Sequence, residues 1–218
     1  MLQNKTIVIC LPGNSYSGYF LKSLVDLMFA IEQKGGIALI SQDYSSMVNF
    51  ARCKVAGADV NRGKHQKPFN GMHYDYMMWI DSDIRFSTKQ FFTLVDMDVD
   101  VASGWYSQPG GVTPVVEHLD DEHYLENGHY NFLSAQQMTE REDVFKAGYI
   151  GFGWVLIKQG VFEQMEYPWF APRLHKLNDD VQEMCSEDVG WCLDAKKLGI
   201  DIHVNPKCRV GHEKTIAI

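Results

Sequence analysis

Apolar residues along this chain follow two patterns, which together predict an α/β fold. Short, mostly apolar runs, typical of strands buried on both faces, occupy residues 6–11, 37–40 and 76–80, and a further strand is expected over 98–105. Residues 20–31 instead keep the i, i+3, i+4 spacing of an amphipathic helix, and further helices are expected over 45–55 and 87–94. This alternation predicts a Rossmann-like, mostly parallel central sheet flanked by helices.

Beyond residue 106 the pattern is less regular. Residues 107–142 are polar, and Asn127-Gly128 predicts a type I′ hairpin turn, so we expect an excursion of short strands outside the main sheet. The apolar run 147–157 is a further expected strand, whose glycines indicate a bulge, close approach by a ligand, or close packing of the sheet. A helix capped by Ser186 and a strand over 200–204 complete the order.

Two carboxylates follow the apolar run 76–80 directly. Asp81 and Asp83 lie one residue apart at its end, and the carboxyl ends of strands form the ligand crevice of open α/β sheets. Carboxylates at i and i+2 offer hard oxygen ligands to Mg²⁺ or Mn²⁺. An isolated Asp-X-Asp is more often a polar turn in which one aspartate caps the next helix, so the functional interpretation depends on the rest of the chain.

Composition narrows the class of protein. With 218 residues, 45% of them hydrophobic and 22% charged, the chain suits one domain. The net charge of −8 argues against a surface built mainly for nucleic-acid backbones and leaves a local basic groove open. The basic segment 61–68 is either a mobile lid over an anionic ligand or a solvated insertion.

The sequence also bears on where the protein works. It shows no leader pattern and no apolar run long enough to span a bilayer, so we expect no membrane anchor. Five cysteines without a CxxC pair suit reduced thiols, and the expected location is the cytoplasm.

Taken in order, these features resemble the GT-A fold of glycosyltransferases, in particular its inverting family 2-type branch. The family's DXD motif resembles residues 79–83, and its nucleotide-cradling strand and loop resemble residues 7–17. An Asn/Arg-bearing helix resembles 49–52, the glycine-rich acceptor-side strand resembles 148–153, and the Glu-Asp pair opening a helix resembles 186–193. A late histidine that completes the metal site in many members resembles His212.

The resemblance implies a single domain in which residues 1–106 form the nucleotide-sugar-binding half and residues 107–218 the acceptor-side half, and it implies a role for each of these positions. The metal, Mn²⁺ or Mg²⁺, would be held by Asp83, Asp81 and His212, and the catalytic base would be Asp188 with Glu187 as its neighbour. Stacking faces for the acceptor would come from Trp105, Trp154 and Trp191, whose types are otherwise found in cores. The nucleotide-sugar donor would be bound by Pro12, Asn14, Asp43, Asn49, Arg52, Asp81, Ser82 and Gly153.

The implied function is metal-dependent transfer of a sugar from a nucleotide-sugar donor to a hydroxyl, with inversion. The acceptor is either a glycan or, as in phage enzymes working in the host cytoplasm, a hydroxymethylated pyrimidine in DNA. A catalytically silent nucleotide-sugar-binding module is a second class. A nucleotidyltransferase is a third, but the loop 12–16 lacks the basic residue usual there.

Overall fold

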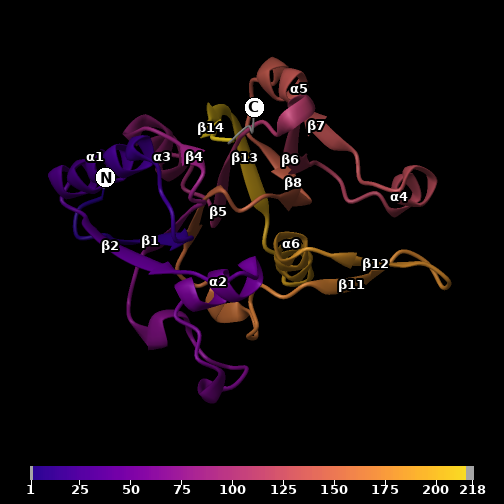
Figure 1. Cartoon of the computed structure of the whole chain (residues 1–218), viewed down its shortest axis with the longest axis horizontal. Coiled ribbons are helices and arrows are strands. Elements are labelled where there is room, and N and C mark those ends of the chain that lie inside the picture. Colours follow the sequence, from indigo (N-terminus) through magenta and orange to yellow (C-terminus); the bar gives the residue numbers. More distant parts are fainter. Residues whose placement is uncertain (1, 215–218) are drawn as a thin grey trace.

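A seven-stranded mixed sheet forms the centre of the protein, seen in a computed structural model that describes residues 2–214. Its strands are β1 (Thr6–Pro12), β2 (Ile37–Asp43), β3 (Tyr76–Ile80), β5 (Val101–Trp105), β8 (Phe145–Ala147), β10 (Trp154–Lys158) and β13 (Ile202–Arg209). They are ordered β2-β1-β3-β10-β5-β13-β8 (Figure 1). Five strands run in one direction, while β10 and β8 run against their neighbours. The expected mostly parallel sheet is therefore confirmed.

The glycine-studded run 147–157 is not one strand. Its first part forms β9 (Tyr149–Ile150), which pairs with β6 (Val112–Val116) in a separate sheet, and its last part forms β10 inside the main sheet. The residues between them turn the chain. A Cβ on Gly151 or Gly153 would come within 2.7 Å of Tyr106, so close packing by the protein itself accounts for both glycines.

Helices cover both faces of the sheet. α1 (Gly18–Gln33) and α3 (Thr88–Val95) pack on one face, and α2 (Val48–Val55) and α6 (Glu187–Lys197) pack on the other (Figure 1). Polar caps fix where these helices begin: the Ser17 hydroxyl accepts from the Phe20 amide, and Ser87 forms a capping box with Gln90. Expected helices at 20–31 and 87–94 are thus confirmed, and α2 begins three residues later than expected.

The excursion contains helices as well as strands. It comprises η3 (Pro109–Gly111), β6, α4 (Asp121–Asn127), β7 (Phe132–Ser134) and α5 (Ala135–Glu140), with the strands ordered β7-β6-β9. The expected hairpin turn at Asn127-Gly128 is wrong. Gly128 adopts φ 75°, the left-handed conformation, and ends α4 by donating its amide to the Tyr124 carbonyl.

A hairpin that the sequence pattern did not indicate lies beside α4. It consists of β11 (Arg173–Lys176) and β12 (Gln182–Cys185), and the tips of the two segments extend together from one side of the molecule (Figure 1). The Tyr124 hydroxyl donates to Glu183 over 3.0 Å, and His175 Nε2 lies 2.9 Å from Asp121 Oδ1. We call residues 120–130 and 173–185 the two arms.

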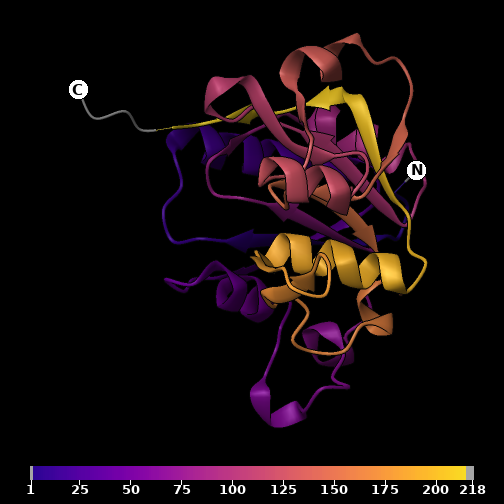
Figure 2. The same ribbon diagram turned by 90° about the vertical axis from the view of Figure 1, so that its right-hand side faces the viewer.

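The basic segment forms two short 3₁₀ turns, η1 (Val60–Arg62) and η2 (Pro68–Gly71). Lys64 pairs with Glu166 at 2.9 Å, and Lys67 donates to the Glu163 carbonyl at 3.0 Å, next to the turn η4 (Phe162–Gln164). The segment lies at the bottom of both views, and the C-terminal strands lie at the top (Figures 1 and 2). Its cations are occupied by neighbouring carboxylates and carbonyls, an arrangement that favours the insertion over the lid.

The last strand runs further than its pattern indicated. β13 continues through Pro206 to Arg209, and the chain then forms β14 (Gly211–His212), which pairs with β4 (Ile84–Arg85). Because β4 begins directly after Asp83, this pairing carries His212 to the end of β3. Among the helices of residues 2–214, none has both the length and the apolar composition to cross a bilayer.

We expect Gly104→Ala to destabilise the central sheet. A Cβ there would lie 2.5 Å from the Cys208 carbonyl oxygen and 2.6 Å from the Trp154 ring, and overpacking of this kind costs about 1–3 kcal/mol of unfolding free energy. The matched control is Gly18→Ala at the start of α1, where no atom lies within 4 Å. Urea unfolding of both variants tests this, and equal stabilities would contradict it.

Candidate functional site

Four of the predicted donor-binding residues gather where β1, β2 and β3 end. Pro12 ends β1 and Asn14 follows that strand, Asp43 ends β2, and Ser82 follows β3. The loops touch one another: the Gly13 amide donates to the Asp43 carbonyl over 3.0 Å, and a Cβ on Gly13 would lie 2.9 Å from that of Ser82. The carboxyl ends of parallel strands thus form a common polar edge, as the topology requires. Asn49 follows Asp43 by six positions and lies in the first turn of α2.

Asp83 and His212 face each other at this edge. His212 Nε2 lies 3.0 Å from Asp83 Oδ2, and its other ring nitrogen, Nδ1, lies 3.1 Å from the Ser107 carbonyl oxygen. A carbonyl can only accept, so the hydrogen-bond partners assign the ring proton to Nδ1. In the neutral ring, Nε2 then carries a lone pair that faces the Asp83 carboxylate. A positive charge between the two atoms, either a second ring proton or a metal ion, satisfies both.

This pair fits a divalent cation as half of a binding site. It offers one nitrogen and one oxygen donor, and a backbone carbonyl orients the histidine, as in many metal sites. Asp81 does not join it, and no group of three histidine, cysteine or carboxylate side chains in residues 2–214 is placed to hold a metal. Lys214 Nζ contacts the same Asp83 oxygen at 2.9 Å, so a metal would compete with this ammonium group.

Asp81 instead pairs with a buried arginine. Arg52 Nη1 and Nη2 lie 2.9 and 3.1 Å from the two Asp81 carboxylate oxygens, and Arg52 Nε donates to Glu187 over 3.2 Å. Only 4% of Arg52 is exposed. Burial acts to lower the pKa of Arg52, but Asp81 and Glu187 outweigh this effect and the pKa is raised. The guanidinium therefore stays charged and joins the end of β3 to the start of α6.

The Glu-Asp pair that opens α6 points in two directions. Glu187 is buried against Arg52, and burial followed by repulsion from Asp188 raises the pKa of Glu187. Asp188 accepts from the Tyr149 hydroxyl over 3.0 Å and from the Ser186 hydroxyl. Ser186 thus bonds to Asp188 instead of capping the helix. Asp188 is consequently the carboxylate of this pair that neighbouring hydroxyl groups hold in place.

The expected tryptophan faces are wrong. Trp105, Trp154 and Trp191 are each at most 1% exposed, so none can stack on an acceptor; they fill the core on both sides of the sheet. Tyr106 is also buried, with its ring 4.8 Å from that of His212, and burial raises its pKa. Gly153 packs directly against the Tyr106 ring, which in turn contacts His212. Gly153 therefore contributes to the packing around His212.

Some residues of the site were not among those expected. Tyr149 lies in the glycine run, where its hydroxyl could not be assigned to Asp188 because the two are 39 positions apart. Lys214 follows His212 by two positions, so its positive charge beside a candidate metal ligand was a signal in the sequence that could have identified it. Ser107 contributes through its backbone carbonyl, which no residue type reveals.

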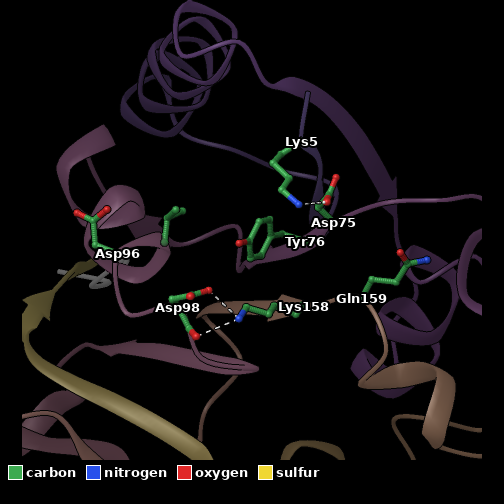
Figure 3. Close-up of a pocket in the computed structure, with 8 residues that line it drawn as sticks. Lys5, Asp75, Tyr76, Asp96, Asp98, Lys158 and Gln159 are labelled. Carbon is green, nitrogen blue, oxygen red and sulfur yellow. Dashed lines mark hydrogen bonds and ion pairs between the residues drawn. The ribbon is translucent and has the colours of Figure 1, made fainter. Parts of the chain in front are cut away.

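A hollow of about 690 Å³ lies at the opposite edge of the sheet and includes none of the predicted site residues. Lys5 pairs there with Asp75 at 2.7 Å and Lys158 with Asp98 at 2.8 Å, across the ring of Tyr76 (Figure 3). Lys5 lowers the pKa of Asp75 against the effect of burial, and Lys158 lowers that of Asp98. The two lysines and the two aspartates neutralise one another as ion pairs. We therefore interpret this hollow as structural.

Comparison with solved structures shows the fold. A197 from STIV matches with a TM-score of 0.52 and 13% identity, over 98% of this chain and 96% of that one. GalNAc-T7, crystallised with UDP, GalNAc and Mn²⁺, matches with a TM-score of 0.56 and 12% identity, over 97% of this chain and 43% of that one. This chain thus spans less than half the length of GalNAc-T7.

No protein-family model matches the sequence, and no curated protein matches it. The structural likenesses establish a mixed α/β fold of the GT-A type, with a seven-stranded central sheet flanked by helices.

We expect Arg52→Met to lower the unfolding free energy by about 3 kcal/mol near neutral pH, because it leaves the buried Glu187 without a partner. The pKa of Glu187, already raised, would rise further. A carboxyl group whose pKa is higher in the folded state destabilises the fold when ionised, and this effect fades as pH falls through that pKa.

The loss should therefore be smaller at about pH 5 than at about pH 7.5. Urea unfolding at both values measures it. Arg85→Met is the matched control, since this exposed arginine lies over the Tyr19 ring and should cost no more than about 1 kcal/mol at either pH. A pH-independent loss in Arg52→Met would contradict the role given to Glu187.

Proposed function

We propose that this protein is a metal-dependent glycosyltransferase that moves a sugar from a nucleotide-sugar donor to a hydroxyl group with inversion. The observation that carries the proposal is the facing pair Asp83 and His212, 3.0 Å apart, at the carboxyl edge of a sheet of the GT-A type. A divalent ion at this pair would take the place of the Lys214 ammonium group beside Asp83, and a donor's diphosphate is the kind of ligand that such an ion holds in this crevice. GalNAc-T7, a structure of similar fold, contains UDP and Mn²⁺.

The donor would lie across the ends of β1, β2 and β3. Pro12, Asn14, Asp43 and Ser82 border this edge and Asn49 follows on α2, so together they would bind the nucleotide. Arg52 would contribute indirectly by fixing the position of Asp81, since its guanidinium contacts both carboxylate oxygens of Asp81.

Asp83 and His212 would hold the metal ion, and their mixed oxygen and nitrogen donors suit Mn²⁺ as well as Mg²⁺. When bound, the ion supplies positive charge that neutralises the diphosphate as it departs. Lys214, which contacts Asp83, would then be free to approach the diphosphate as a second cation.

Inversion needs a carboxylate on the acceptor side, and we assign this role to Asp188. As the acceptor oxygen bonds to the anomeric carbon, its proton passes to Asp188. The bond from that carbon to the diphosphate oxygen breaks, and its electron pair leaves with the nucleotide. The Tyr149 and Ser186 hydroxyls both donate to Asp188, so they would hold its carboxylate toward the acceptor.

All five cysteines are unpaired and buried. We infer a reducing compartment such as the cytoplasm, where free thiols persist.

The first test follows release of free nucleotide from a panel of nucleotide sugars with Mn²⁺, with and without acceptors. We expect turnover to need the metal and Asp83→Asn to reduce it at least about 100-fold, because the diphosphate loses its counter-charge. Asp98→Asn, at the opposite edge, is the matched control and should retain activity. Full turnover in excess chelator would refute metal dependence, and donor binding without any turnover would identify a silent binding module.

The second test concerns the base. Asp188→Asn should keep the fold and donor binding while the transfer rate falls about 10²–10⁴-fold, since an amide cannot take the proton. Tyr149→Phe removes only a hydroxyl that donates to Asp188, so it should cost much less and leave the donor KM unchanged. Donor binding measured by calorimetry and transfer measured in parallel separate these effects. If Asp188→Asn transfers within a few-fold of wild type, another group is the base.

A further inference from the structure

A hollow of about 220 Å³ lies between the two arms, beside the proposed base. Tyr124, Tyr130 and Phe132 line it from the first arm and the strand that follows, and Glu183 and Met184 line it from the second. The hollow also includes Ser186, whose hydroxyl donates to Asp188. Any molecule held there would therefore lie next to the carboxylate that we assign as the base.

The walls of the hollow combine aromatic faces with one carboxylate. The Tyr124 and Tyr130 rings meet at 4.8 Å, and their hydroxyls are fixed by Glu183 and Asp121. Phe132 remains 36% exposed, with its ring edge-on to that of Tyr149 at 5.9 Å. Flat apolar faces beside a few oriented polar groups form a surface suited to a ring that has C–H faces and hydroxyl edges.

Charge decides which acceptor suits this hollow. Its lining, all of it within the described residues, contains no lysine or arginine. Carboxylates dominate the arms around it: Asp120, Asp121, Glu122 and Glu126 on one, and Asp179, Asp180 and Glu183 on the other. Lys176 pairs with Asp179 at 2.8 Å, and Arg173 pairs with Asp194 at 2.7 Å, so a carboxylate balances the charge of each of these basic side chains. A polyanion would be repelled here.

We propose that the hollow between the arms is the acceptor subsite and that it takes a neutral sugar ring. This inference rests on the proposed function for its meaning, but the binding it predicts can be tested without turnover. The ring would stack on Phe132 and Met184, and its hydroxyl edge would reach toward Asp188. The same argument disfavours modified DNA as the acceptor.

The test is saturation-transfer NMR with neutral probes, namely methyl β-D-glucopyranoside, methyl β-D-galactopyranoside and methyl α-D-mannopyranoside. We expect at least one of them to receive saturation at its ring C–H protons. Phe132→Ala and Met184→Ala should each weaken its binding about ten-fold, because each removes part of a stacking face. Phe132→Leu keeps apolar volume but lacks the flat face, so it should also lose affinity even where the alanine variant folds poorly.

Leu174→Ala is the matched control. Leu174 is the cross-strand partner of Met184, the two are 69% and 71% exposed, and only Met184 lines the hollow. The Leu174→Ala variant should therefore bind the methyl glycoside as tightly as the wild-type protein does. Equal binding by wild type and Phe132→Leu would overturn the proposal, as would the absence of binding by all three glycosides.

A short duplex containing 5-hydroxymethylcytosine serves as the polyanionic probe. Binding of the duplex in place of the glycosides, with a steep salt dependence, would also overturn the proposal and identify nucleic acid as the acceptor. If no nucleotide sugar is turned over while glycoside binding still depends on Phe132, the proposed function fails and the subsite stands.

Discussion

Arg52 carries a positive charge inside the protein, and the arrangement of the site depends on it. A buried guanidinium is tolerated only when carboxylates surround it, and here Asp81 and Glu187 supply them. These three residues come from α2, from the end of β3 and from the start of α6, so one cation fixes three elements against each other. Residues 1–106 and residues 107–218 are joined at this point, since Arg52 reaches Glu187.

The pairing of Arg52 also separates the roles of the two carboxylates in each acidic pair, Asp81 with Asp83 and Glu187 with Asp188. Asp81 is held by Arg52, which leaves Asp83 for His212 and a cation. Glu187 is held by Arg52, which leaves Asp188 for the hydroxyls of Tyr149 and Ser186. One carboxylate of each pair is structural and the other is available for chemistry. An Asp-X-Asp and a Glu-Asp sequence thus acquire their geometry from a single arginine.

Local patterns predicted the elements that local physics controls. The apolar runs became β1 and β3, and the serines at 17 and 87 cap helices as their type favours. The sequence could not predict contacts between distant positions: Arg52 and Glu187 are 135 residues apart. The direction of β10, the burial of Trp154 and the hairpin β11–β12 also depend on which partner each segment meets. The late position of His212 was informative only because β14 pairs with β4.

The site at the ends of β3 and β14 and the hollow between the arms differ in how their charges are balanced. Near the ends of β3 and β14, Arg52 pairs with Asp81 and Glu187, and Lys214 pairs with Asp83. The arms, by contrast, carry carboxylates around a hollow lined by aromatic rings. Because the cations of the first region are already compensated, a diphosphate would bind there only with the proposed metal ion at Asp83 and His212. The carboxylates of the arms would repel a diphosphate from the hollow, while a neutral ring would be affected little by them.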